Sequence, residues 1–406
     1  MRVLAVGNMY PPHHFGGYEL MWRSAMLHLE RHGHEARVLT TDLDIGAAEP
    51  DDANVRRALR WYWRDHEFPR LSPLDRVRLE RHNARVLDDQ IREFRPDVVS
   101  WWSMGGMSLS MLERVRRKGL PAVAFVVDDW LDYGRHVDGW TRAFRSRPRA
   151  LAALAELVVR VPARVDLEHA ARCVFVSETT RGRAAAAGVV PASSGIAHGG
   201  IETDLIGPAP EREWGWELLY VGRLDPRKGV DTAVRALARL PDAARLTLVG
   251  GWDEREERRL RDLAEAEGVT ARIRFAGQRS RAEVRDAYDA SDLVFFPVVW
   301  EEPWGLVPIE AMARGRPVVA TGRGGSGEYL RDGSNAVLFE AEDPDALAAA
   351  VQRVAGDPEL RRRLRAGGLE TARRHTEDGY NDAVLSELEN AARGARRSAS
   401  ASRTAG

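Results

Sequence analysis

The sequence predicts an α/β protein with two domains, each built around a parallel β-sheet. Three observations point to this class: a length of 406 residues, short apolar runs that alternate with helical patterns, and a Pro/Gly-rich break near the middle. Chains of this length usually divide into domains of about 100–200 residues. Apolar strands separated by helices predict parallel sheets joined by right-handed crossovers.

Two series of strands are expected. The first comprises Val3–Gly7, Ala36–Thr40, Asp97–Trp101, Ala122–Val127 and Cys173–Val176. The second comprises Glu217–Val221, Leu246–Gly250, Ile273–Phe275, Leu293–Phe296, Val318–Ala320 and Ala336–Phe339. Between them lie Gly199–Gly200 and the Pro-rich Gly207–Pro210, so a linker is expected near 203–213. Each series has the βαβ pattern of a Rossmann-like domain, which predicts one domain over residues 1–205 and a second over 206–375.

The composition is that of a soluble globular protein, with 44% hydrophobic and 30% charged residues. No run approaches about 18 consecutive apolar residues, so no transmembrane helix is expected. Met1–Gly7 has the pattern of a buried strand and lacks that of a signal peptide. A net charge of −1 gives no general attraction to nucleic acid. The single cysteine, Cys173, excludes an internal disulfide and favours the cytoplasm.

Two segments interrupt the alternation of strands and helices. Ala53–Phe94 is rich in arginine and aromatic residues around Trp61–Trp63, and Trp140–Arg172 has a helical pattern with many arginines. Either segment could touch a lipid interface, which would place the protein at the inner face of the cell membrane, or could pack its aromatic side chains inward. The last residues are small and polar, and this tail (393–406) is expected to be disordered.

The first candidate for anion binding is the glycine pair Gly16 and Gly17, which comes just before the helical run Tyr18–Arg31. Glycines at this point let backbone N–H groups approach an anion at a helix N-terminus. The alternative is a flexible turn. No Gly-x-Gly-x-x-Gly follows the first strand, so a dinucleotide-binding oxidoreductase is disfavoured.

The second candidate is the basic loop Gly222–Gly229, which follows the first strand of the second domain. Arg223 and Lys228 lie five residues apart, and a turn between them would bring both cations to one point. The guanidinium of an arginine can bind two phosphate oxygens at once, and the ammonium of a lysine adds a point charge, so the pair suits a diphosphate. Lys228 is one of only two lysines among 60 basic residues, which favours function over the alternative, a solvated turn.

The third candidate is the segment Glu302–Ala313. Glu302 falls in a loop, and Glu310 falls early in a helix among apolar neighbours, so Glu310 should face a cleft or a paired partner. A carboxylate can accept hydrogen bonds from two vicinal ribose hydroxyls, or from a sugar hydroxyl. The backbone N–H groups at the helix start would face a phosphate; they belong to Gly305, Leu306 and Val307. The alternative is an exposed Glu302 and a salt-bridged Glu310.

Together these motifs resemble the retaining nucleotide-sugar glycosyltransferases of family GT4. The resemblance rests on Gly222-Arg223-Leu224, Lys228-Gly229 and Glu302 followed eight residues later by Glu310. Further matching motifs, in the family's order, are Gly16–Gly17, Arg95–Val99, Gly324–Gly325 with Glu328, and Asp332–Gly333.

The resemblance implies the GT-B fold, in which two Rossmann-like domains face each other across a cleft and a C-terminal helix, here about 376–392, crosses back to the first domain. It implies transfer of a hexosyl group, with retention, from a UDP- or GDP-sugar to a hydroxyl of a glycan, lipid-linked or small-molecule acceptor. It also implies that no metal or other cofactor is needed. By the same resemblance Arg223 and Lys228 bind the diphosphate, Glu302 lies near the donor sugar, Glu310 binds the ribose, and the stretch from Gly277 to Arg279 borders the base.

The chain departs from the family pattern after the fourth expected strand. The family usually has His-Asp there, whereas this chain has Asp128-Asp129. Asp128 takes the position at which a histidine meets the donor sugar, so the donor preference of other members cannot be carried over. Asp129 is a candidate for positioning the acceptor, and the alternative is that both residues cap the following turn. A GT-B sugar-nucleotide epimerase and a catalytically silent nucleotide-sugar-binding module stay open as further alternatives.

Overall fold

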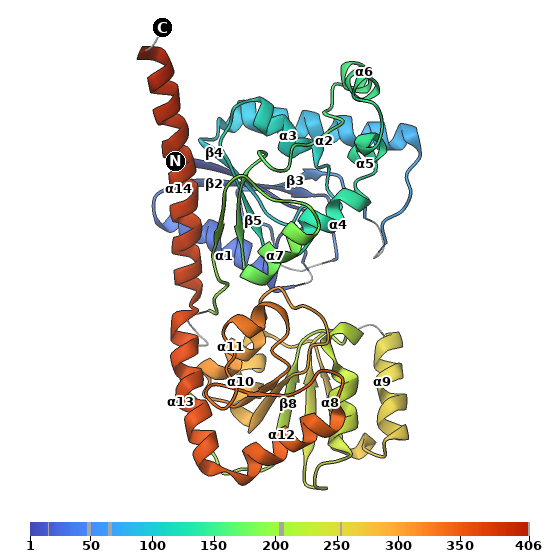
Figure 1. Cartoon of the computed structure of the whole chain (residues 1–406), viewed down its shortest axis with the longest axis vertical. Helices are drawn as coiled ribbons and strands as arrows, with labels where there is room; N and C mark the ends of the chain where they lie inside the picture. The colour runs from blue at the N-terminus through green and yellow to red at the C-terminus, as the bar shows by residue number, and fades with distance from the viewer. Residues whose placement is uncertain (15, 47–49, 64–66, 203–206, 252–253, 405–406) are drawn as a thin grey trace. The chain divides into compact units, whose positions relative to one another are not determined.

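The computed structural model describes residues 1–14, 16–46, 50–63, 67–202, 207–251 and 254–404, the last nine as backbone alone. It divides into two compact units (Figure 1). The first contains residues 1–198 together with the chain from Tyr380 onward, and the second contains Gly199–Gly379. Each unit is built on one sheet with helices packed against both faces (Figure 1).

The sheet of the first unit has seven parallel strands in the order β3-β2-β1-β4-β5-β6-β7. The strands are β1 (Arg2–Val6), β2 (Glu35–Thr41), β3 (Val55–Leu59), β4 (Val98–Trp101), β5 (Ala122–Val126), β6 (Arg172–Phe175) and β7 (Ser194–Ile196). The helices are α1 (Gly17–Arg31), α2 (Pro73–Phe94), α3 (Ser110–Arg117), α4 (Trp130–Val137), α5 (Gly139–Arg145), α6 (Arg149–Val159) and α7 (Glu178–Ala186).

The sheet of the second unit has six parallel strands in the order β10-β9-β8-β11-β12-β13. They are β8 (Glu217–Val221), β9 (Arg245–Val249), β10 (Ile273–Gly277), β11 (Leu293–Phe296), β12 (Val318–Ala320) and β13 (Val337–Leu338). The helices are α8 (Val230–Leu237), α9 (Glu254–Ala266), α10 (Arg281–Ala290), α11 (Leu306–Ala313), α12 (Pro344–Gly356) and α13 (Pro358–Arg374), with 3₁₀ turns η2 (Pro226–Lys228), η3 (Thr270–Arg272) and η4 (Gly324–Glu328).

The strand cores explain why the sequence predicts this class correctly. Val3–Val6 of β1 and Leu293–Phe295 of β11 are fully buried, because helices cover both faces of each parallel sheet. Two strands, β3 and β7, were not expected. β3 reads VRRAL and β7 reads SGI, and neither has the continuous apolar run that marks the central strands. Both lie at the edges of their sheet, where fewer neighbours bury the side chains.

The order of strands reverses once in each sheet, between β1 and β4 and between β8 and β11. Loops at the carboxyl ends of the strands on either side of such a reversal form the usual ligand site of open α/β sheets. In the second unit these loops are the ones after β8 and β11. They carry Lys228 and Glu302 respectively.

The C-terminal helix α14 (Glu377–Thr404) returns to the first unit, as the resemblance implied. Its buried side chains recur every four residues, at Tyr380, Val384, Leu388 and Ala392. Asp382 Oδ1 lies 2.9 Å from His28 Nε2, and Glu387 binds Arg172 through contacts of 2.6 and 2.9 Å.

The structure differs from two expectations about the chain's ends and boundaries. Residues 393–404 continue α14 as helix, because their alanines and arginines are good helix formers that extend an existing helix. The second unit begins at Gly199 and so precedes the expected residue 206, since Ile201 bridges to Thr376 and a Cβ on Gly200 would lie 2.0 Å from the Thr376 carbonyl oxygen. Of the expected linker, residues 203–206 lie outside the described part of the chain.

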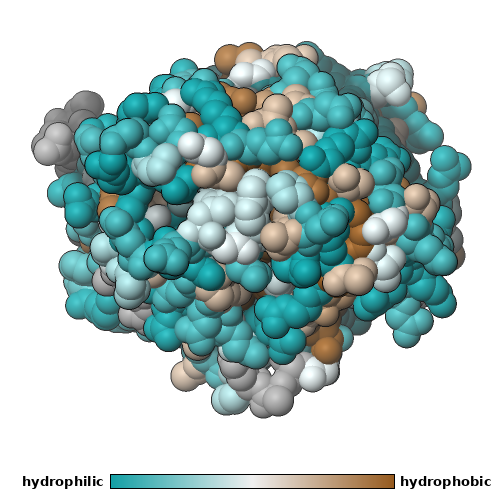
Figure 2. Space-filling view, turned by 90° about the horizontal axis from the view of Figure 1, so that it is seen from below, coloured by the Kyte–Doolittle hydropathy of each residue, from teal (hydrophilic) through white to brown (hydrophobic). Residues whose placement is uncertain are grey.

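The aromatic segment around residue 62 packs inward. Tyr62 is buried and its hydroxyl donates to Glu80 Oε1 over 2.7 Å, while Trp61 packs against the core of the first unit. Hydrophobic residues form only small, separated patches on the face of the molecule drawn in Figure 2. Among the described helices, none is both long enough and apolar enough to cross a bilayer.

Candidate active site

The basic loop after β8 is held in shape by glycines. Gly222 has φ +143°, and a Cβ on Gly250 would lie 2.0 Å from the Gly222 carbonyl oxygen. Gly229 has φ +71°, and its Cβ would lie 1.8 Å from the Pro297 carbonyl oxygen. Glycine is therefore required at these contacts, because any side chain would separate the loops after β8, β9 and β11.

Within this loop the backbone is ordered by short local hydrogen bonds. The Tyr220 hydroxyl donates to the Arg223 carbonyl over 2.7 Å, and Asp225 accepts from the Arg227 N–H over 2.9 Å at the start of η2. Arg223 is exposed, and its guanidinium forms no hydrogen bond or ion pair with any described residue. Its five N–H donors are thus available to an anionic ligand.

Lys228 and Glu302, predicted from separate motifs, lie in direct contact. Lys228 Nζ is 2.6 Å from Glu302 Oε2, and the Trp300 indole N–H donates to the same oxygen over 2.7 Å. Both charged side chains are largely buried. The Arg227 guanidinium lies 4.8 Å from the centre of the Trp300 ring, a cation–π contact. The loops after β8 and β11 therefore bring Lys228, Arg227 and Glu302 together around Trp300, and Arg227 is itself paired with Asp225 at 2.6 Å.

A glycine-rich turn after β12 supports the backbone of Glu302. The Gly325 N–H donates to the Glu302 carbonyl over 2.7 Å. A Cβ on Gly324, which has φ +68°, would lie 2.3 Å from that carbonyl oxygen. The close approach of η4 to Glu302 needs glycine for both reasons, which gives the Gly324–Gly325 motif a structural function.

Gly305, Leu306 and Val307 form the start of α11. Gly305 precedes the helix with φ +84°, and a Cβ there would lie 2.8 Å from the Phe296 ring. The Tyr329 hydroxyl donates to the Gly305 carbonyl. The N-terminus of α11 thus lies just beyond the carboxyl end of β11, on the same side of the sheet as Lys228, where its unpaired N–H groups favour an anion.

Glu310 is buried on α11 and has two partners. The Tyr288 hydroxyl donates to Oε2 over 2.7 Å, and Arg281 Nη1 donates to Oε1 over 3.2 Å. Arg281 also pairs with Glu202 at 2.9 Å. Burial lowers the pKa of Arg281, but the charges of Glu310 and Glu202 outweigh it and raise that pKa overall. Each carboxylate oxygen of Glu310 can accept a further hydrogen bond, so the pairing leaves capacity for hydroxyl groups.

The remaining predicted residues of the second unit border this cluster less closely. Gly277 ends β10 with φ +75°, and its carbonyl accepts from the Gly250 N–H over 3.0 Å. Arg279 is exposed and pairs with Glu283 at 3.3 Å, one turn into α10. Nothing in these contacts directs Arg279 toward the cluster.

The predicted residues of the first unit lie in two places. Gly16 is the N-cap of α1, where its N–H donates to Glu19 Oε2 over 3.1 Å, and Gly17 is exposed as the first helical residue. Asp128 and Asp129 follow β5 and line a cavity of about 340 Å³ with Thr180.

The two aspartates have different partners. Asp128 accepts from the Tyr133 hydroxyl over 2.9 Å and from the Trp130 N–H over 3.3 Å, and burial raises its pKa to about 6. Asp129 is paired with Arg183 at 2.6 Å, and burial again raises its pKa. Asp128 thus caps the turn, whereas Asp129 forms no side-chain capping hydrogen bond, so the alternative interpretation holds for Asp128 alone.

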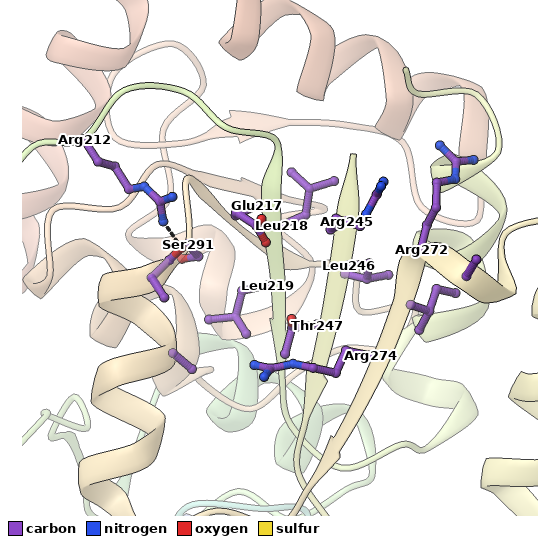
Figure 3. Close-up of a pocket in the computed structure, with 14 residues that line it drawn as sticks. Arg212, Glu217, Leu218, Leu219, Arg245, Leu246, Thr247, Arg272, Arg274 and Ser291 are labelled. Carbon is purple, nitrogen blue, oxygen red and sulfur yellow. Dashed lines mark hydrogen bonds between the residues drawn. The ribbon is translucent and has the colours of Figure 1, made fainter. Parts of the chain in front are cut away.

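A different cavity, of about 520 Å³, lies at the opposite ends of the strands (Figure 3). Glu217 and Arg245, the first residues of β8 and β9, line it. Its arginines mostly bind backbone carbonyls: Arg212 binds Ala290, Arg245 binds Asp242, and Arg272 binds Leu237. They stabilise the strand starts, and none of the predicted site residues lies here.

Two groups of side chains in the described part of the chain lie close enough to share a cation. They are His28 with His32 and Asp382, and Asp166 with Glu168 and His169. Neither group contains a predicted site residue.

Several site residues escaped the sequence analysis. Trp300, Tyr288 and Arg281 touch the two glutamates from elements that carry no motif of their own. Arg227 is adjacent to Lys228 and could have been singled out from the same basic run. For Tyr288 the available signal was a polar tip in the apolar stripe of α10, which is also typical of an ordinary core tyrosine.

Two family models match the chain. The model Glycosyltransferase Family 4 matches residues 15–205, and the model Glycosyl transferases group 1 matches residues 205–371. The lipopolysaccharide core biosynthesis glycosyltransferase LpsE of Rhizobium meliloti (strain 1021) is 36% identical over 172 residues, which cover 42% of this chain and 49% of that protein. The chain spans about half the length of the curated relatives it matches.

Solved structures share the fold over almost the whole chain. Sucrose-phosphate synthase from Thermosynechococcus elongatus has a TM-score of 0.71 at 20% identity, with 96% of this chain and 98% of that chain covered. Anabaena Alr3699/HepE in complex with UDP and glucose has a TM-score of 0.70 at 19% identity, with 96% and 100% covered. The two family models follow each other along the chain, each on one Rossmann-like domain of the GT-B fold. The chain therefore belongs to the group 1 glycosyltransferases of family GT4.

Proposed function

We propose that this protein transfers a glycosyl group from a nucleoside-diphosphate sugar to an acceptor hydroxyl, with retention of configuration and without a metal ion. The observation that carries the proposal is the ion pair between Lys228 and Glu302, which joins the loops after β8 and β11, with Arg223 on the same loop as Lys228. Anabaena Alr3699/HepE, which shares the fold, was solved with UDP and glucose, and this supports a nucleotide-sugar donor.

The cations stabilise the leaving group. In the reaction the bond from the anomeric carbon to the diphosphate oxygen breaks, and negative charge accumulates on the phosphate oxygens. Arg223 would hold two of those oxygens as a fork, while Lys228 retains two N–H donors beyond its contact with Glu302. The N–H groups at the start of α11 add a fixed dipole that needs no rearrangement during the step.

The carboxylates hold the donor. Glu302 is oriented by Lys228 and Trp300 through Oε2, which leaves Oε1 to accept a hydrogen bond from a sugar hydroxyl. Glu310, oriented by Tyr288, would accept from the ribose. The acceptor hydroxyl forms the new bond on the face that the diphosphate leaves, and its proton passes to the departing phosphate oxygen.

The test measures release of nucleoside diphosphate from a panel of UDP- and GDP-sugars, with and without acceptor, in parallel reactions that contain either EDTA or a divalent cation. We expect release that depends on the acceptor and is lost in Lys228→Ala. Product analysis by NMR should show the anomeric configuration of the donor retained. Conversion of the donor to its epimer without an acceptor would assign an epimerase. Donor binding with no turnover on any acceptor would show that the protein is a nucleotide-sugar-binding module. A requirement for a divalent cation would refute the metal-free mechanism.

A further inference from the structure

Helix α6 of the first unit exposes most of its large apolar side chains to solvent. Its buried residues include Ala152 and Val159, while the larger apolar side chains face solvent. The exposed fractions are 49% for Leu151, 57% for Leu154, 76% for Leu157 and 69% for Val158. At 100° per residue these four lie on one face of the helix. Elsewhere in the described chain such exposed side chains occur singly, so α6 carries a concentrated apolar face that indicates an interaction site.

The apolar face is surrounded by positive charge without compensating carboxylates. Six arginines fall within residues 139–165, against a single acidic residue, Glu156: Arg142, Arg145, Arg147, Arg149, Arg160 and Arg164. None of the six forms an ion pair with a described carboxylate. Glu156 is itself bound by Arg117 at 2.8 Å. The flanks of α6 therefore have an uncompensated positive potential.

A groove adjoins the same face. Residues of α3 and α6 enclose a cavity of about 510 Å³, whose lining includes Leu157, Glu156 and the cations Arg114, Arg117, Lys118 and Arg160. Asp88 pairs with Arg114 and Lys118, and Arg117 pairs with Glu113 and Glu156, so of these four cations only Arg160 has no ion pair with a described carboxylate. Leu157 thus belongs both to the exposed apolar face and to the groove. An apolar strip flanked by arginines that have no described carboxylate partner matches the boundary between headgroups and acyl chains of an anionic bilayer.

We propose that α6 and its flanking arginines form a membrane-docking face that binds the first unit to a bilayer containing anionic lipid. α6 lies at the periphery of its unit, beyond α5 (Figure 1). A second copy of the chain is the weaker occupant, because a symmetric contact would bring these arginines against their own counterparts. Anionic lipid complements both the apolar face and the charges.

The experiment is flotation of the full chain with vesicles of neutral phosphatidylcholine, with and without 30 mol% phosphatidylglycerol. We expect binding to the anionic vesicles alone, weakened by raising the salt concentration. Leu154→Gln with Leu157→Gln should reduce the partition coefficient by roughly tenfold per leucine, and Arg147→Gln with Arg149→Gln by roughly fivefold per arginine. Leu74→Gln, which changes a 70% exposed leucine on α2 of the same unit, is the matched control and should bind like the parent.

Each outcome decides for or against the docking face. All these side chains are exposed, so circular dichroism should show unchanged folding, and the activity of the variants on soluble substrates should equal that of the parent. Absence of binding to anionic vesicles at low salt overturns the proposal, as does equal binding by the leucine variant. If light scattering shows a dimer that the leucine variant loses, while vesicles bind neither protein, the face belongs to a second copy of the chain.

Discussion

Replacing Asp128 with asparagine should stabilise the protein in a way that depends on pH. Asp128 accepts hydrogen bonds from the Tyr133 hydroxyl and the Trp130 N–H, yet burial raises its pKa from the usual 3.8 to about 6. In the unfolded chain the Asp128 carboxyl loses its proton near pH 3.8. Between those two pH values the folded state therefore holds more protons, and the free energy of unfolding falls as pH rises.

The magnitude follows from the size of the pKa difference. About two pKa units at 1.36 kcal/mol each amount to about 3 kcal/mol of lost stability above pH 6. Asparagine keeps the shape of the protonated acid without its ionisation. Asp128→Asn should therefore unfold with a free energy up to about 3 kcal/mol above that of the parent at pH 7.5, and with nearly the same value at pH 4.

The assay is urea unfolding of parent and variant at pH 4, 5, 6 and 7.5, followed by tryptophan fluorescence. Asp88→Asn is the control with the opposite sign. Burial would raise the pKa of Asp88, but hydrogen bonds from Arg114 and Lys118 hold it below its usual value, so this variant should lose stability at pH 7.5. An Asp128→Asn difference that stays constant from pH 4 to 7.5, or that has the wrong sign at pH 7.5, would refute the reasoning.

Three further predictions concern the second unit. Lys228→Ala should lower kcat/KM by roughly 100- to 1,000-fold, as loss of a donor to the developing charge does elsewhere, while Lys118→Ala leaves turnover of soluble substrates unchanged. Gly324→Ala should lower both Tm and activity, because its Cβ would lie 2.3 Å from a backbone oxygen. Gly268 has a similar φ of +70°, but a Cβ there would meet no atom within 4 Å. Thermal unfolding of Gly268→Ala in parallel therefore measures the cost of the backbone conformation alone. Glu310→Gln should raise the donor KM by roughly tenfold with a smaller change in kcat, and equal KM values would remove Glu310 from donor binding.

The central strands and their order of appearance could be predicted because each is a continuous apolar run. Val3–Val6 and Leu293–Phe295 are buried on both faces, and an uninterrupted run of apolar residues indicates this kind of burial directly. The edge strands β3 and β7 could not be predicted, because their sequences, VRRAL and SGI, contain no continuous apolar run. The helical end of α14 was missed for a related reason: small residues without an apolar stripe resemble a flexible tail.

The cations and carboxylates of the site were recognised from local motifs, but their partners were not. Lys228 and Glu302 stand 74 positions apart in the chain, and their 2.6 Å contact depends on the pairing of β8 with β11. The contact of Trp300 with Glu302 follows from that same loop geometry. Tyr288 reaches Glu310 only because α10 and α11 are packed beside each other over one sheet.

By itself, the sequence determined the α/β class, the two Rossmann-like domains and the chemical identity of the charged groups in the second domain. These properties depend on residue type and short spacings, which a chain carries whether or not it is folded. Only the tertiary structure decided that Lys228 and Glu302 share an ion pair, that Asp128 is enclosed enough to titrate near pH 6, and that α6 turns its leucines to solvent. Contact, burial and exposure arise from residues distant in the chain, so they come into being only when the sheets assemble.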